Sequence, residues 1–415
     1  MIYFEALMIS SPEVNPSPML EGIKNFFKRA DLLLLALCIA ANTFGLILVY
    51  SATRFQSTYH SLPMKQAVAM AIGIVVFVLC NYVDLEILME KWKLVFVLSS
   101  LFILVLVPFG TGYQGNKNWL QFSWLPFNIM PAEIVKLFFV LLLAKQLVHL
   151  QKRDRNDLSK FRSVAQLVLH LGWFCGLIFV VSGDAGSALV YAAIFAIMCW
   201  VAGLKKRWFL IGAGAAAVGG IGLWLYLPDD NYWIMRIRVV LDHSLDPMNK
   251  GWNQARSLLA VRSGGLTGEG YLHGLLTQNP SKNFLPERYT DFIFSTCAEE
   301  WGLLGCILLL GLLAAIILRC IYVGLTARSA FSALTAMGFG GMLIFQVGLN
   351  VGMCLYVMPV VGITLPFISY GGSSLITLYA AMGFVSGIKM RSLPSWLSDR
   401  TDIQRPTRQA SLYRN

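Results

Sequence analysis

Charged residues are scarce in this chain. Asp, Glu, Lys and Arg make up 13% of the 415 residues, whereas 57% are hydrophobic and the mean hydropathy is +0.64. Soluble domains carry about 25% charged residues, so the composition excludes an ordinary soluble protein and indicates a polytopic membrane protein. The formal net charge is nevertheless +11. The cations stand in short clusters between apolar runs, which indicates basic loops beside membrane helices and argues against nucleic-acid binding.

Several motifs of soluble enzymes are absent. The eight cysteines are scattered through apolar segments without a CxxC pair or a Cys/His cluster, so neither a zinc site nor a disulfide framework is expected. The sequence contains no phosphate-binding loop, HExxH or GxSxG, and therefore gives no support to phosphate-loop ATPase, zinc-hydrolase or serine-hydrolase chemistry. The N-terminal tail shows no cleavable signal pattern, and we expect the first apolar run to be a retained span.

About ten apolar runs approach the roughly 20 residues that a helix needs to cross a bilayer. They lie near residues 31–51, 66–83, 94–110, 131–150, 164–182, 185–203, 207–226, 291–319, 331–358 and 371–390. We predict an all-α polytopic membrane protein with about ten transmembrane helices. It has a tail over residues 1–30, a membrane domain over 31–390 and a second tail over 391–415. The boundary between the fifth and sixth runs, around Gly183 and Asp184, is the least distinct.

The distribution of basic residues predicts the orientation. Clusters follow the fourth run, precede the seventh, flank the loop after the eighth and mark the C-terminal tail. Their members are Lys152, Arg153, Arg155, Lys160, Arg162, Lys205, Lys206, Arg207, Arg319, Arg328, Arg391, Arg400, Arg405 and Arg408. All of them fall on one side of the membrane if both termini are cytoplasmic. The large loop between the seventh and eighth runs, about residues 228–290, is then extracytoplasmic.

This outer loop is too long for a simple connection, and loops of such length are usually functional or disordered. Apolar residues such as Trp252, Leu258 and Leu259 argue against disorder and predict short helices on the membrane face. Its cations suit a lipid that carries phosphates. The alternative is that they have no purpose, because long loops translocate whatever their charge.

An acid stands where this loop enters the eighth run. Asp291 follows Thr290 and precedes the apolar residues Phe292, Ile293 and Phe294. A carboxylate at the mouth of a membrane helix is costly to desolvate, which makes it a functional candidate. The alternative is an ordinary N-cap, in which Thr290 or Asp291 satisfies the first amides of the helix.

Other polar residues interrupt the apolar runs. Glu133 and Lys136 are three residues apart on one helical face and can pair. Asp184 has no local partner. Glu300 lies about two turns into the eighth run, where a water-filled groove or a nearby cation must compensate it.

Two glycine-containing segments also stand out. The glycines of Ser263–Gly274 predict tight turns that bring backbone amides near a ligand, although plain loop flexibility is an equal alternative. The prolines and glycines of Pro359–Ser374 cannot continue a helix, and broken backbone at membrane depth is tolerated where it lines a cavity.

In this order the segments resemble the SEDS family (shape, elongation, division and sporulation) of RodA and FtsW over about residues 31–389. The motifs that carry the resemblance are MPAE with Lys136, GDAG, KGWNQARSLLAVRSGGLTGEG, LPERYTDFIF and LPFISYGGSS. The last two are long and specific. Departures from the family pattern, which affect donor-site details, are Asn118, Ser182, Gly183, Asn253, Arg256, Arg262 and Tyr289. The elongation, division and sporulation branches are not distinguished.

The resemblance implies a peptidoglycan glycosyltransferase in the bacterial plasma membrane that polymerises lipid II outside the cytoplasm. It also implies a class B penicillin-binding protein and other elongation or division proteins as partners. Asp291 takes the place of the family's essential aspartate. A carboxylate suits removal of a proton from the acceptor sugar hydroxyl, and cations suit the departing pyrophosphate. A single dominant acid with an activated leaving group predicts inversion at the sugar.

Our candidates for the pyrophosphate are Arg236, Lys282 and Arg288. The full set of predicted substrate-binding residues is Glu133, Lys136, Asp184, Arg236, Ser263, Gly264, Gly265, Lys282, Pro286, Glu287, Arg288, Thr290, Glu300, Asn350, Ser369, Tyr370, Gly371, Gly372 and Ser373. No protein metal ligands and no cofactor are predicted, although magnesium or manganese could accompany the pyrophosphate. The alternatives are a flippase for a polyprenyl-linked precursor and a non-catalytic scaffold.

Overall fold

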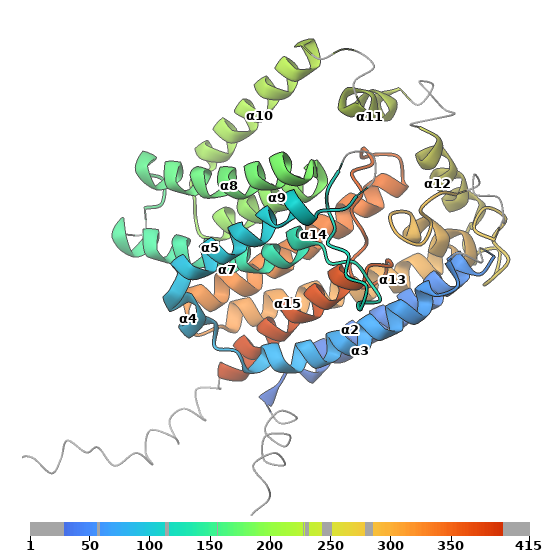
Figure 1. Ribbon diagram of the computed structural model, residues 1–415, viewed down its shortest axis with the longest axis horizontal. Coiled ribbons are helices and arrows are strands. Elements are labelled where there is room, and N and C mark those ends of the chain that lie inside the picture. The colour runs from blue at the N-terminus through green and yellow to red at the C-terminus, as the bar shows by residue number, and fades with distance from the viewer. Residues whose placement is uncertain are drawn as a thin grey trace, which may run out of the picture.

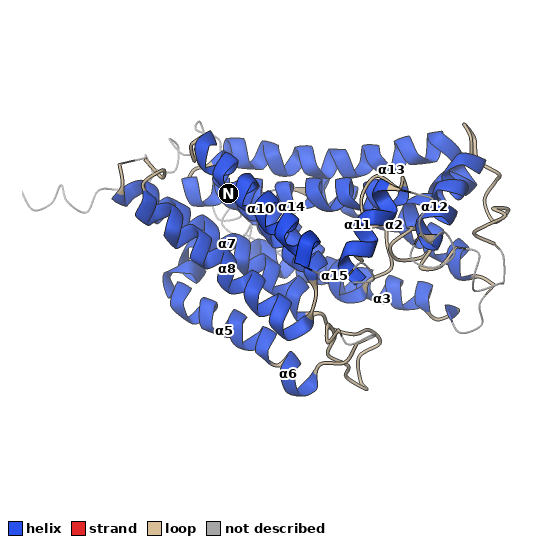
Figure 2. Ribbon diagram, turned by 90° about the horizontal axis from the view of Figure 1, so that it is seen from above, coloured by secondary structure: helices blue, strands red, loops and turns tan. Residues whose placement is uncertain are grey.

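The computed structural model describes residues 29–392 except 56–58, 113–115, 156, 227, 229–231, 243–250 and 279–284. Both predicted tails therefore lie almost wholly outside the described residues. The first half of the chain forms α2 (Leu32–Thr53), α3 (Leu62–Tyr82), α4 (Leu85–Leu88), η2 (Met89–Lys91), α5 (Trp92–Leu104), α6 (Leu106–Phe109), α7 (Pro131–Arg153), α8 (Phe161–Ser182) and α9 (Ala185–Val201). The second half forms α10 (Lys206–Tyr226), α11 (Tyr232–Leu241), α12 (Trp252–Ser263), α13 (Ile293–Thr326), α14 (Ala330–Cys354) and α15 (Gly372–Arg391). Between Arg29 and Ser392 the described backbone has only isolated β-bridges besides its helices (Figure 2).

Local chemistry explains where several helices begin and end. The Asp31 side chain accepts a hydrogen bond from the Leu34 amide and caps α2. Pro131 occupies the first turn of α7, where its missing N–H costs nothing. Gly183 adopts a left-handed conformation with φ of 69° and ends α8, and Asp184 then caps α9. The predicted break between the fifth and sixth runs is confirmed.

Within the described residues, eight helical segments have the length and composition to cross a membrane. The predicted class of all-helical multi-pass membrane protein is thereby confirmed. Two further predicted runs are helical but outside this group, namely α7, which carries Glu133 and Lys136, and α9, which has 17 residues. The count of ten spans therefore stays a prediction. The third run begins at Leu85 rather than near residue 94, because the polar stretch after Asp84 is already helical.

The central helices pack closely through small residues. α3 and α15 lie side by side, as do α13 and α14 (Figure 1). A Cβ on Gly73 of α3 would stand 2.4 Å from the Tyr379 ring of α15, and one on Gly383 would stand 2.6 Å from the Phe77 carbonyl. Close approach at small residues is the usual basis of helix association in a bilayer. By contrast, α10 extends from the edge of the bundle with most of its side chains exposed (Figure 1).

The backbone between α14 and α15 is not helical, as the prolines and glycines predict. Side chains from the first two spans satisfy its carbonyls. Asn42 donates to the Phe367 carbonyl at 2.8 Å, and Gln66 donates to the Ser369 carbonyl at 3.1 Å. A Cβ on Gly45 would stand 2.5 Å from the Ile368 carbonyl oxygen, so only glycine permits this approach. Such partners are what broken backbone requires at membrane depth.

The large outer loop contains the short helices α11 and α12, as predicted. α12 packs against α13 and α14, and both short helices lie beyond the ends of the long helices (Figure 1). The longer loops gather mainly at the end of the bundle where α12 lies (Figure 2). This end also carries the turn that precedes α13.

Candidate active site

Asp291 lies in a tight turn rather than at a helix cap. The Thr290 and Phe292 amides both donate to the Glu287 carbonyl, at 3.1 Å each. The residue that caps α13 is Phe292, which offers no side-chain hydrogen bond. The Thr290 hydroxyl donates to the Glu287 carboxylate at 2.9 Å. The alternative in which Thr290 or Asp291 caps the helix is therefore wrong.

The Asp291 main chain is held while its carboxylate is left available. Asn350 of α14 donates its amide to the Asp291 carbonyl and to the Ile363 carbonyl, at 2.8 Å in each case. Among the described residues, the half-buried carboxylate accepts no hydrogen bond. The non-helical residues 355–371 between α14 and α15 are called the broken segment below. The Oδ2 atom of Asp291 lies 3.9 Å from the position of a Cβ on Gly362, so the broken segment forms the wall beside the carboxylate.

The surroundings give this carboxyl group an unusual affinity for protons. Burial raises the pKa of Asp291 to about 7, the Glu287 carboxylate adds to the rise, and Arg236 opposes it. Desolvation disfavours the charged form, and the two neighbouring charges act in opposite directions. A base whose pKa lies near the operating pH can both take up a proton and release it, which makes Asp291 suitable for general base catalysis.

Arg236 reaches the same place from the outer loop. It lies on α11 and donates from Nη1 to the Val360 carbonyl at 2.6 Å. Its charge acts on Asp291, although 55 residues separate the two positions in sequence. The structure thus brings one predicted pyrophosphate-binding cation beside the predicted base.

Hydrogen bonds join residues 289–291 to the broken segment. The Ser369 hydroxyl donates to the Thr290 carbonyl at 2.6 Å, and the Tyr370 amide donates to the Tyr289 carbonyl at 2.9 Å. The rings of Tyr289 and Tyr370 are 6.2 Å apart, in an edge arrangement. Ser369, Tyr370, Thr290 and Asn350 are therefore brought together around Asp291, and their predicted role in substrate binding stays a prediction.

A second polar cluster lies where the broken segment meets α7. Lys136 donates to Glu133 at 2.7 Å, so the predicted pair forms, and Lys136 is only 1% exposed. The Ser374 hydroxyl donates to Glu133 at 3.3 Å, and the Met130 amide donates to the Ser373 hydroxyl at 3.2 Å. Ser373 and Ser374 lie in the first turn of α15, which begins at Gly372 and has Gly371 as its N-cap. The segment that contacts Asp291 thus continues directly into the Glu133–Lys136 pair.

Asp184 has a structural role in the described residues. Its carboxylate accepts hydrogen bonds from the Ser187 amide at 2.9 Å and from the Ser187 hydroxyl at 2.7 Å. These contacts make it the N-cap of α9. The next turn packs against the broken segment, because a Cβ on Gly186 would stand 2.3 Å from the Val361 carbonyl oxygen.

Glu300 and Arg288 also form hydrogen bonds within the protein, although the Oε2 atom of Glu300 is buried without a partner among the described residues. Glu300 accepts hydrogen bonds from Ser51 and Gln278. These donors help to stabilise the buried carboxyl group, a role for which the sequence analysis expected a water-filled groove or a nearby cation. Arg288 is 3% exposed and donates to the Ala52 carbonyl at 2.8 Å. Its charge also acts on Glu300. These contacts tie the outer loop to α2 and leave Arg288 closed to a substrate.

The glycine-rich turns contact α13. A Cβ on Gly264 would stand 1.8 Å from the Ala298 carbonyl oxygen, and the Leu303 amide donates to the Gly265 carbonyl at 3.0 Å. Ser263 donates to the Ala260 carbonyl within its own helix. The amides near Gly264 thus pack a loop against the bend of α13 at Gly302, where φ is 64°.

Three predicted substrate-binding positions remain, namely Pro286, Glu287 and Lys282. Pro286 is half-buried at the start of the turn, and Glu287 is exposed, whereas Lys282 lies outside the described residues.

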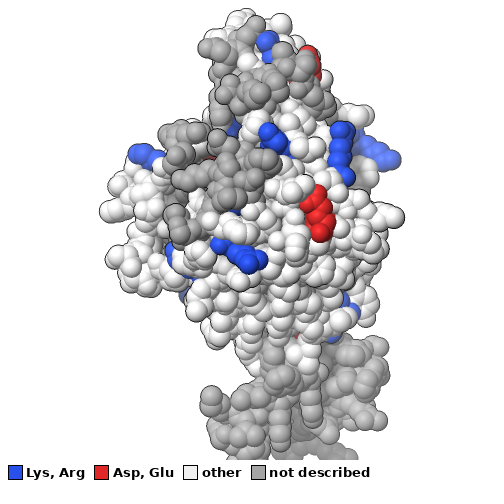
Figure 3. All heavy atoms as spheres, turned by 90° about the vertical axis from the view of Figure 1, so that its right-hand side faces the viewer, with Lys and Arg blue, Asp and Glu red and all other residues white. Residues whose placement is uncertain are grey.

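In the part of the chain that the structure describes, no three His, Cys, Asp or Glu side chains gather into a metal site. Figure 3 shows the end of the molecule that carries the outer loop, where described Lys and Arg side chains outnumber described Asp and Glu.

The cavity inside the broken segment is small. Thr364, Ser369, Gly371 and Ser374 line a space of about 10 Å³, which suits one water molecule. This space is too small for anything larger than water, and Asp291, which is half-exposed, does not line it.

These features define an integral membrane protein whose helix-breaking segment supports a half-buried acid and an adjacent cation. The chain belongs to the FtsW/RodA/SpoVE family of cell cycle proteins, whose sequence pattern matches residues 31–393.

Among its relatives is the peptidoglycan glycosyltransferase MrdB of Escherichia coli K12. It is 33% identical over 322 residues, which cover 77% of this chain and 83% of the relative. The stage V sporulation protein E of Bacillus subtilis is 34% identical over 371 residues and is covered to 97%, with 87% of this chain matched. A solved chain from a peptidoglycan synthase complex that coordinates polymerization and crosslinking is 29% identical. It matches with a TM-score of 0.74 over 88% of this chain and 99% of its own.

The sequence analysis missed the residues that hold the broken segment. Asn42 and Gln66 are buried in apolar helices and donate to its carbonyls. A polar side chain within a span was the available signal, because such residues rarely lack a partner or a function.

Proposed function

We propose that this chain is a peptidoglycan glycosyltransferase that polymerises lipid II, with Asp291 as the general base. The observation that carries the proposal is the half-buried carboxylate of Asp291, whose pKa is raised to about 7 beside Arg236. Relatives named as peptidoglycan glycosyltransferases support the reaction class.

The chemistry is a single displacement. The Asp291 carboxylate takes the proton of the acceptor sugar hydroxyl, and the oxygen attacks the anomeric carbon of the donor. The bond from that carbon to the polyprenyl pyrophosphate breaks, and the electron pair leaves with the pyrophosphate. Attack and departure on opposite faces invert the anomeric centre. Asp291 then releases its proton to water, which a pKa near 7 permits.

Arg236 contributes positive charge on the donor side. It is anchored on the Val360 carbonyl, so its guanidinium is positioned before the substrate arrives. A preorganised cation stabilises developing negative charge better than a mobile one. The described residues bring no three ligands together for magnesium or manganese, and the mechanism uses only the side chains of the chain. A divalent cation that arrives with the pyrophosphate is a separate proposal, which chelation tests.

The setting of the reaction is also part of the proposal. Both termini face the cytoplasm and the Asp291 turn faces outward, because the basic loops then lie on one side. A class B penicillin-binding protein is the proposed partner, and other elongation or division proteins complete the assembly. Support comes from the structural relative, which is part of a peptidoglycan synthase complex.

Purified protein with its transpeptidase partner and lipid II in detergent tests the proposal. We expect Asp291→Ala to form the complex but to make no glycan polymer. Asp157→Asn is the matched control, because Asp157 is an acid in the loop after α7 that pairs with Lys205 and belongs to no predicted site, and this variant is expected to keep its activity. Polymer made by Asp291→Ala would overturn the proposal. Precursor flipping without polymer in the wild type would instead support a flippase, and neither activity in an intact complex would support a scaffold.

A further inference from the structure

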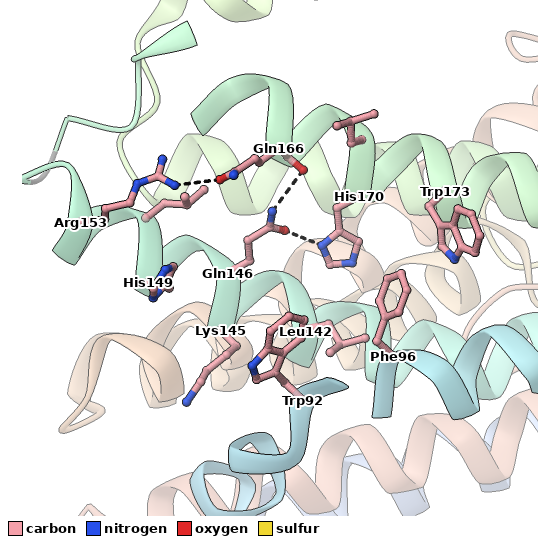
Figure 4. Close-up of a pocket in the computed structure, with 12 residues that line it drawn as sticks. Trp92, Phe96, Leu142, Lys145, Gln146, His149, Arg153, Gln166, His170 and Trp173 are labelled. Atoms are coloured by element: carbon pink, nitrogen blue, oxygen red, sulfur yellow. Dashed lines mark hydrogen bonds between the residues drawn. The ribbon is translucent and has the colours of Figure 1, made fainter. Parts of the chain in front are cut away.

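A cavity of about 620 Å³ opens between α5, α7 and α8 (Figure 4). Its size lies within the range of pockets that bind small ligands, about 300–1,000 Å³. Its lining residues include the aromatic side chains of Trp92, Phe96 and Trp173 and the apolar side chain of Leu169. None of the described residues that line it is acidic. The cavity therefore offers an apolar, acid-free space within the membrane domain.

The cavity is distinct from the candidate active site. Both contact α7, but the Glu133–Lys136 pair lies at the start of that helix. Lys145 lies 12 residues beyond Glu133 on α7, which corresponds to about 18 Å at 1.5 Å per residue. Arg153, at the far end of α7, also lines the cavity. An occupant of this space thus lies toward the opposite face of the membrane from Asp291.

Basic side chains are concentrated at one side of the cavity. Lys145, His149 and Arg153 follow one another along α7 at spacings of four residues, which place them on one helical face. Arg153 pairs with Asp154 at 3.1 Å, and so its charge is partly compensated. Lys145 forms no ion pair with any described residue. A half-buried lysine in a membrane helix usually has an anionic partner or reaches the membrane interface.

The polar groups inside the cavity are already engaged with one another. Figure 4 shows a chain of hydrogen bonds from Arg153 to Gln166, from Gln146 to the Gln166 carbonyl, and between Gln146 and His170. The first bond, at 3.0 Å, and a second from Nη2 to the Ser163 hydroxyl at 2.8 Å hold the Arg153 guanidinium against α8. These bonds leave the buried Nε2 atom of His170 without a partner among the described residues, and the rest of the surface left for an occupant is mainly aromatic and aliphatic.

The mouth has the character of a membrane interface. Trp92 and Trp173 are 45% and 49% exposed, and Leu169 is 71% exposed. Tryptophan is typical of the headgroup level, where one end of a ligand is apolar and the other is polar. The ammonium of Lys93 stands 5.8 Å from the Trp92 ring and adds a further positive charge beside the mouth.

We propose that this cavity binds one anionic phospholipid. An acyl chain fills the space between Phe96, Leu142 and Trp173, and the phosphate lies against Lys145, with His149 and Arg153 beside it. The apolar lining accounts for the chain, and the concentration of cations without lining acids accounts for the choice of an anionic headgroup.

Native mass spectrometry of the purified full chain, in detergent with added phosphatidylglycerol, tests this proposal. We expect the wild type to retain one phosphatidylglycerol. A cation near a membrane surface contributes about 1 kcal/mol, so Lys145→Gln is expected to weaken retention about fivefold. Leu169→Trp, at an exposed position of the mouth, is expected to abolish retention by filling the space. Lys206→Gln is the matched control, because Lys206 is another cation beside a membrane helix and does not line the cavity.

Thermal unfolding of each variant without added lipid confirms that it is folded. Equal retention of phosphatidylcholine, or unchanged retention by Lys145→Gln and Leu169→Trp, would overturn the proposal. Preferential retention of a polyprenyl phosphate would also overturn it and would assign the cavity to a carrier lipid instead.

Discussion

The rate of polymerisation should follow the protonation of Asp291. A general base acts only when it is deprotonated, and the pKa of Asp291 is raised to about 7 by burial and by Glu287. With this pKa, about one tenth of the molecules carry the carboxylate at pH 6 and about nine tenths at pH 8. We therefore expect kcat/KM for lipid II, which reports the groups of the free enzyme, to rise about tenfold between these values.

The neighbouring charges give this prediction its specificity. Arg236 lowers the pKa of Asp291, so Arg236→Gln should move the midpoint of the profile to higher pH. Glu287 raises it, so Glu287→Gln should move the midpoint to lower pH. The assay is polymer formation with the transpeptidase partner held constant from pH 5.5 to 8.5. Asp157→Asn serves as the control and should leave the midpoint unchanged.

Two results would refute this reasoning. One is a rate that does not depend on pH in this range although the complex stays intact. The other is a midpoint that moves in the same direction in Arg236→Gln and Glu287→Gln, because opposite charges must act on Asp291 in opposite senses.

Three further expectations concern stability. The raised pKa of Asp291 favours its protonated form in the folded state, so the associated stability is lost as the pH rises from about 4 through about 7. Asp291→Asn should therefore raise the thermal stability at pH 8, by at most about 4 kcal/mol, with little gain at pH 4. Gly45→Val should destabilise the protein by about 1–3 kcal/mol, since its Cβ would stand 2.5 Å from the Ile368 carbonyl oxygen, and unchanged unfolding in detergent would contradict this. Asn350→Leu should cost about 2–4 kcal/mol and most of the activity, because it leaves the Asp291 and Ile363 carbonyls without their donor; full activity with normal unfolding would refute that assignment.

The sequence predicted the parts of the fold that depend on local composition. Apolar runs marked the spans, and Pro359, Gly362 and Gly371 marked the break between α14 and α15. The start of the third span was misplaced because Asp84 and Glu86 made a short helix look like a loop.

The contacts between distant segments were less accessible. A rule that treats ionisable residues near membrane helices as functional identified Asp291, Arg288 and Glu300 alike. Arg288 finds its partner at Ala52, 236 positions away, and Glu300 finds one at Ser51. The local sequence does not predict these partners. Only burial and hydrogen bonding in the structure distinguish Arg288 and Glu300, which have structural roles, from the half-exposed Asp291. The same limitation hid the roles of Asn42 and Gln66.

The most direct measurement is the turnover of lipid II by Asp291→Asn in the intact synthase complex at pH 8. This substitution keeps the shape of the side chain and removes only its ability to accept the proton. We expect polymer formation to fall by at least about 100-fold, as for loss of a general base, while partner binding stays at the wild-type level. Polymer formation at the wild-type rate would contradict the assignment of Asp291 as the base.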